Sequence, residues 1–128
     1  MKDQLIEKAR KSLENAYTPY SLYKVGAAIE GASGKVYAGC NIENASYGLT
    51  MCAERVAIFK GVSEGEKSFK RIVIVSSVEN PPLPCGACLQ VMSEFCDENF
   101  EVYIGKDNGE IERFLLKELF PKPFILGR

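Results

Sequence analysis

The sequence predicts an α/β protein of three layers (α/β/α), in which helices cover both faces of a mixed five-stranded sheet. A β-branched run at residues 71–78, RIVIVSSV, is typical of a strand buried on both faces. Residues 3–16 place apolar side chains at helical spacing and charges on the opposite face. Two apolar segments, 24–30 and 35–40, flank a short turn-rich loop, which favours a β-hairpin. Together these features favour layered packing of helices on a sheet.

The remaining elements follow from apolar spacing and from the residues that interrupt it. In order, we expect a helix over 52–62, the strand over 71–78, a helix over 85–96, a strand over 100–104 and a helix over 112–119. Pro121 cannot continue the last helix, and a further short strand is expected near Glu110 or Phe124. The β-α-β-α-β part should be parallel.

Composition bounds the class of protein. A chain of 128 residues fits one domain, taken as residues 1–128, and its formal net charge of -1 gives no basis for wrapping nucleic acid. The absence of histidine excludes mechanisms that need an imidazole base from this chain. We see neither an apolar segment long enough to cross a membrane nor the apolar block of a signal peptide. We therefore expect a cytoplasmic protein.

Three of the five cysteines stand where a metal site would need them. Cys85 and Cys88 lie three residues apart at a predicted helix start, and Cys52 opens the previous helix, 33 residues earlier. Both helices should leave the same edge of the sheet, so their first turns can converge. Three thiolates around Zn²⁺ leave one tetrahedral position open, which is the arrangement of a catalytic site. Alternatively, the cysteines fill core space, or a carboxylate closes the site as a structural one.

Glu54, two residues after Cys52, favours the catalytic alternative. A carboxylate beside an open zinc position can take a proton from bound water and deliver it to a substrate.

Several motifs resemble one family, the small zinc-dependent cytidine deaminases. The segments Cys52-Ala-Glu54 and Pro84-Cys-Gly-Ala-Cys88 are similar to its zinc motif, with cysteine where related deaminases have histidine. The segments Pro19-Tyr-Ser, Tyr23-Lys-Val-Gly-Ala27 and Gly39-Cys-Asn-Ile-Glu-Asn-Ala45 extend the resemblance, which runs from about Leu5 to Phe124. The resemblance implies a cytidine deaminase-like fold with one Zn²⁺ per chain.

The resemblance also implies roles for individual residues. Cys52, Cys85 and Cys88 match the zinc ligands, and Glu54 matches the residue that shuttles protons. Arg55 resembles an arginine that hydrogen-bonds the ligand thiolates; without the family it would be interpreted as a solvated helix residue.

Other matched residues concern the substrate. Asn41 and Glu43 match the pair that binds the ribose hydroxyls, although on sequence alone they indicate only a loop with an Asx-turn. The carbonyl of Ala53 would receive the exocyclic amino group, and Tyr23 stands where the family commonly has phenylalanine against the pyrimidine. The aromatics Tyr47 and Phe124 match residues that reach the pocket from neighbouring subunits of a homotetramer.

The implied activity is deamination of cytidine and deoxycytidine to uridine and deoxyuridine, with release of ammonia, in pyrimidine salvage. Zinc would lower the pKa of bound water, and Glu54 would take its proton and pass it to ring nitrogen N3 before attack at C4. One alternative is a deaminase of another cytosine compound, such as blasticidin S. Another, from a different class, is a non-catalytic zinc-stabilised interaction domain. One departure is Leu89, where the family usually has arginine.

Overall fold

The computed structural model describes residues 2–78, 81–106 and 108–127. Five strands form one sheet in the order β2-β1-β3-β4-β5. The strands are β1 (Val25–Gly31), β2 (Val36–Cys40), β3 (Phe69–Ser76), β4 (Glu101–Gly105) and β5 (Ile111–Leu115). Only the β3–β4 pair is parallel among these described strands, so the predicted mixed five-stranded sheet is confirmed.

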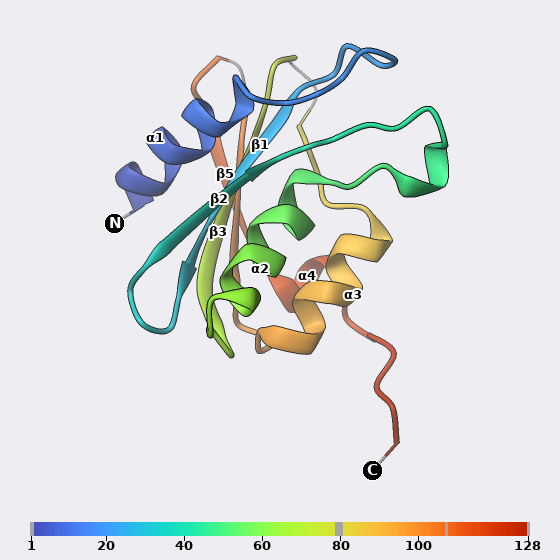
Figure 1. Cartoon of the computed structure of the whole chain (residues 1–128). Coiled ribbons are helices and arrows are strands. Elements are labelled where there is room, and N and C mark those ends of the chain that lie inside the picture. The colour runs from blue at the N-terminus through green and yellow to red at the C-terminus, as the bar shows by residue number, and fades with distance from the viewer. Residues whose placement is uncertain (1, 79–80, 107, 128) are drawn as a thin grey trace.

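Helices cover both faces of the sheet, as the sequence predicts (Figure 1). They are α1 (Lys2–Leu13), α2 (Ala53–Ser63), α3 (Gly86–Phe95) and α4 (Leu116–Leu119), with a 3-10 turn η1 (Tyr47–Leu49) before α2. The helix α1 lies on one face, and α2, α3 and α4 lie on the other. The three-layer architecture is therefore confirmed.

The central strands pack against the helices on both faces of the sheet, because successive side chains of a strand point to opposite faces. In β3, Ile72 and Ile74 pack into the core below α2 and α3, whereas Val73 and Val75 pack against α1. All four side chains are fully buried. The unbroken β-branched run thus has the double burial that the sequence predicts.

The C-terminal part of the chain corrects one prediction. Residues 112–119 were expected to be helical, but Ile111–Leu115 pair antiparallel with β4 and only Leu116–Leu119 form a helical turn. A tight turn containing Gly109, at φ 91°, returns the chain alongside β4, whose open edge provides backbone partners for residues 111–115. Pairing with an existing strand outweighs weak local helix preference.

The strands β2, β3 and β4 run in the same direction, although antiparallel β1 lies between β2 and β3. The segments after β2 and β3 therefore emerge at the same end of the sheet and lead into α2 and α3. This arrangement brings the first turns of the two helices close to each other, as the sequence predicts.

Candidate metal centre and active site

The three predicted thiols converge. The sulfur atoms of Cys52, Cys85 and Cys88 all lie within 4.8 Å of one another. The Cys52–Cys85 separation is 3.9 Å and the Cys85–Cys88 separation is 3.6 Å, far longer than a disulfide bond. Cys52 and Cys85 each hold the extended N-cap position of a helix, and Cys88 lies in the first turn of α3. Helix N-termini favour negative charge, which suits thiolates.

These distances fit a zinc ion. Four ligands at about 2.3 Å around a tetrahedral ion place sulfur atoms about 3.8 Å apart, which the two separations bracket. Among the described residues, the cluster holds three thiols and no carboxylate, and the chain contains no histidine. Such a donor set leaves the fourth tetrahedral position to water or substrate. This finding disfavours a closed structural zinc site.

Arg55 contacts the cluster directly. Its Nη2 atom donates to the sulfur of Cys52 at 3.4 Å, the interaction that the sequence resemblance implies. A hydrogen bond from the Cys88 thiol, followed by that of Arg55, holds the pKa of Cys52 below its ordinary value. The neighbouring Cys52 side chain, and then burial, raise the pKa of Cys88. The guanidinium therefore offsets part of the negative charge that three thiolates would concentrate.

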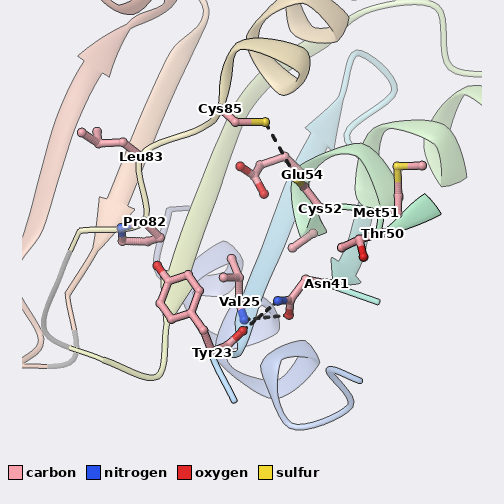
Figure 2. A pocket seen from close by; sticks show the side chains of 11 residues that line it. Tyr23, Val25, Asn41, Thr50, Met51, Cys52, Glu54, Pro82, Leu83 and Cys85 are labelled. Carbon is pink, nitrogen blue, oxygen red and sulfur yellow. Dashed lines mark hydrogen bonds between the residues drawn. The ribbon is translucent and has the colours of Figure 1, made fainter. Parts of the chain in front are cut away.

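Glu54 lies in the first turn of α2 with a side chain that is almost completely buried. Figure 2 shows its carboxylate pointing into the cavity, on the side of Cys52 and Cys85. Burial, and then the nearby charge of Cys52, raises the pKa of Glu54 to about 7. An isolated buried carboxylate is unfavourable for stability, so its place beside a metal cluster indicates chemistry rather than folding.

A cavity of about 190 Å³ opens in front of these groups. Tyr23, Asn41 and Ala53, three of the predicted substrate-binding residues, lie in its wall. Five wall residues were not predicted from the sequence: Val25, Thr50, Met51, Pro82 and Leu83. All five lie in or next to a motif named from the sequence: four directly precede a zinc-motif segment, and Val25 lies within the segment Tyr23–Ala27.

Asn41 lines this cavity, whereas Glu43 lies outside it. The side chain of Asn41 accepts from the backbone of Val25 at 2.9 Å and donates to the carbonyl of Tyr23 at 2.8 Å. Glu43 lines an adjacent cavity of about 240 Å³, and Thr50 lines both cavities. The two predicted ribose-binding residues are thus neighbours in space, and both hold the loop that carries Tyr23.

Tyr47 and Phe124 lie outside the cysteine-lined cavity of their own chain. Tyr47 is exposed, lines the Glu43 cavity and packs edge-on to Tyr20. Phe124 is also exposed, and the side chain of Gln90 hydrogen-bonds both its N–H and its carbonyl. These two bonds hold Phe124 beside α3, because Gln90 belongs to that helix.

Three further residues, Leu89, Cys40 and Cys96, lie outside the metal-binding site. Leu89 is buried in the core below α3, where a charged side chain would need a partner. Cys40 and Cys96 are partly buried and lie outside the metal cluster. Burial raises the pKa of the Cys96 thiol, so this residue stays neutral.

The fold and the three-thiol cluster beside a buried carboxylate define the class of zinc-dependent hydrolytic enzymes. A family model described as "Cytidine and deoxycytidylate deaminase zinc-binding region" matches residues 1–104. A cytidine deaminase of Sporosarcina psychrophila is 47% identical over 122 residues, which cover 95% of this chain and 90% of the relative. The crystal structure of cytidine deaminase from Burkholderia pseudomallei superposes with a TM-score of 0.92 at 43% identity, covering 97% of this chain and 99% of that one. The chain belongs to the cytidine and deoxycytidylate deaminase family.

A relative named for a different substrate is less similar to this chain. A blasticidin-S deaminase of Bacillus cereus is 29% identical over 126 residues, covering 92% of this chain and 88% of the relative. In the part of the chain that the structure describes, no helix combines the length and apolar character needed to cross a membrane.

Proposed function

We propose that the protein is a zinc-dependent cytidine deaminase that converts cytidine and deoxycytidine to uridine and deoxyuridine with release of ammonia. The observation that carries the proposal is the buried Glu54 carboxylate beside the three-thiol cluster, inside a cavity. The high identity to cytidine deaminases over nearly the whole chain supports the same substrate class. The greater distance of the blasticidin-S deaminase disfavours that alternative.

The two adjacent cavities suggest how a nucleoside would bind. The base would occupy the cavity of Glu54 and Ala53, with the aromatic ring of Tyr23 against the pyrimidine. The ribose would then extend past Thr50 toward Glu43. Asn41 retains one amide N–H beyond its bond to Tyr23, and this N–H can donate to a sugar hydroxyl. A free ribose matches this polar end of the pocket better than a modified sugar.

The chemistry follows from what the residues of the chain can donate and accept. Zinc held by Cys52, Cys85 and Cys88 would lower the pKa of a water molecule so that it can act as a nucleophile near neutral pH. Glu54 takes the proton of that water and delivers it to N3, which makes C4 electrophilic. The oxygen of the water bonds to C4, and Glu54 then transfers the second proton of the water to the amino group. The C4–N bond breaks, ammonia leaves, and Glu54 returns to its starting state.

Ala53 and Arg55 support these steps from either side of Glu54. The carbonyl of Ala53 would accept a hydrogen bond from the amino group and so orient C4 toward the nucleophile. Arg55 would stabilise the ligand thiolates through Cys52 without touching the substrate.

The proposal includes a cytoplasmic homotetramer that acts in pyrimidine salvage. Exposed aromatic side chains at Tyr47 and Phe124 support an assembly in which neighbouring subunits complete each pocket. A reducing cytoplasm suits the five cysteines, which are all unpaired. Sedimentation of the purified protein would check the assembly, because a monomer at assay concentrations contradicts this part of the proposal.

The experiment that tests the function follows ultraviolet absorbance when zinc-replete protein meets cytidine, with blasticidin S in a parallel cell. We expect conversion of cytidine by the wild type, and a rate lower by about three orders of magnitude in Glu54→Gln with zinc retained. Turnover of the antibiotic alone would establish the alternative substrate. Turnover of neither, with zinc fully bound, would favour a structural zinc domain.

A further inference from the structure

A short loop at residues 18–22 leads into the wall of the cysteine-lined cavity. Its backbone is fixed by Glu43, whose carboxylate accepts from the N–H groups of Tyr20 at 3.0 Å and Ser21 at 3.1 Å. The hydroxyl of Ser21 donates to the other oxygen of the same carboxylate. Three donors from two consecutive residues therefore converge on one side chain that lies more than twenty residues further along the chain.

Ser21 connects this carboxylate to the cavity. The same hydroxyl oxygen that donates to Glu43 accepts the backbone N–H of Tyr23 at 3.0 Å. The carbonyl of Tyr23 accepts from Asn41, so the backbone of Tyr23 is held on both sides. Ser21 thus joins Glu43, in one cavity, to Tyr23, in the wall of the other.

The conformation of Leu22 is held by hydrogen bonds around it and not by packing of its own side chain. Leu22 adopts φ 60°, in the left-handed region that leucine rarely occupies. Its side chain is 77% exposed, so apolar contacts cannot compensate for the unfavourable backbone. Hydrogen bonds on either side hold it instead, including the N–H of Leu22 to the carbonyl of Thr18 at 3.0 Å. If one bond is removed, the loop is expected to relax.

We propose that Ser21 is a positioning residue of the active site, which fixes Tyr23 against the pyrimidine by linking its backbone to Glu43. The inference rests on the proposed function and adds a residue to it. Of the four lone-pair positions of Glu43, three serve this loop, which leaves one for a sugar hydroxyl.

The test compares serine variants in the cytidine assay. Ser21→Ala removes the hydroxyl bonds to Glu43 and to the N–H of Tyr23, and it should raise KM for cytidine about three- to tenfold, with kcat within about twofold of wild type. Ser21→Thr keeps the hydroxyl and should restore KM. Ser77→Ala is the matched control, since the hydroxyl of Ser77 accepts the N–H of Lys24 at 3.2 Å, next to Tyr23, without contacting Glu43. We expect its KM to stay near that of wild type.

A double-mutant cycle tests whether Ser21 acts through Tyr23. In a Tyr23→Ala background, Ser21→Ala should change KM by less than about twofold, because the ring that it positions is gone. A full effect in that background, or an unchanged KM in Ser21→Ala, would overturn the inference. A lower melting temperature with unchanged KM would also overturn it, because that result means a merely structural role. Failure of the wild type to convert cytidine would instead contradict the proposed function.

Discussion

Replacing Gly39 with alanine tests whether strand β2 sets the position of the helix that carries Glu54. A methyl group on Gly39 would lie 2.7 Å from the backbone nitrogen of Ala57 and 2.9 Å from the carbonyl oxygen of Ala53. Both atoms belong to the backbone of α2, so no flexible side chain can move aside to make room. To reach ordinary contact at 3.4 Å, α2 must move from β2 by about 0.7 Å.

This displacement predicts two separate effects. Overpacking of a buried position lowers the free energy of unfolding by about 1–3 kcal/mol. The same movement shifts the first turn of α2, which carries Cys52, Ala53 and Glu54, relative to α3. Because misplacement of reacting groups by 1 Å can lower rates by about 100-fold, we expect kcat/KM for cytidine to fall by about 10- to 100-fold.

The assay combines urea denaturation with cytidine kinetics at measured zinc content. Gly34→Ala is the matched control, because Gly34 has φ 93° in the β1–β2 turn and open space around it. That variant should lose about 1 kcal/mol of stability through backbone strain and keep its kcat/KM. Wild-type kinetics in Gly39→Ala would refute the view that this glycine contact positions the active site.

Three further predictions concern charge and metal binding. Arg55→Ala should lower kcat by about 10-fold or more while circular dichroism and zinc content stay unchanged; full turnover at full zinc occupancy would count against its contact with the thiolates. Hydrogen bonds from Ser33 hold the pKa of Glu66 below its ordinary value of 4.5. The charged carboxylate therefore stabilises the folded protein at higher pH. This stabilisation is lost as the pH falls through the pKa that Glu66 has in the folded protein. Glu66→Gln should therefore be less stable than wild type in urea at about pH 7, and this difference should shrink as the pH is lowered; a difference that stays the same at every pH would exclude this origin. Cys96→Ser should retain one zinc per chain and Cys88→Ser should lose it, as measured by atomic absorption. The reverse result would mean that the zinc ligands are assigned to the wrong cysteines.

The metal cluster could be predicted because its geometry follows from local spacing and sheet topology. Cys85 and Cys88 share the first turn of one helix, and Cys52 caps another. Strands that run in the same direction deliver both helix starts to one end of the sheet. The convergence of the three thiols needed no knowledge of longer-range contacts.

The fold at the C-terminus could not be predicted from apolar spacing alone. Ile111, Leu115 and Leu119 have helical spacing, and nothing local shows that the first two will pair with β4. The Asn108–Gly109 pair favours a tight hairpin turn and agrees with the short strand expected near Glu110, but the point where the strand ends and the helix begins depends on pairing with β4.

Contacts between loops that are distant in the chain could not be predicted from the sequence either. No spacing in the sequence relates Ser21 to Glu43, since their bond depends on how the loop at residues 18–22 crosses the segment after β2. The roles proposed for Tyr47 and Phe124 depend on neighbouring subunits, so one chain cannot define their contacts. The sequence therefore predicts the chemistry of the site better than the shape of its substrate pocket.

The most direct test of the account is zinc titration of the metal-free protein with cytidine turnover as the readout. Removing the metal with a chelator should abolish deamination, and adding zinc back should restore it in proportion until one equivalent per chain is bound. The same titration of Glu54→Gln should bind one zinc and restore no turnover. Full activity in the metal-free protein, or zinc binding at one equivalent without turnover in the wild type, would contradict a catalytic zinc at Cys52, Cys85 and Cys88.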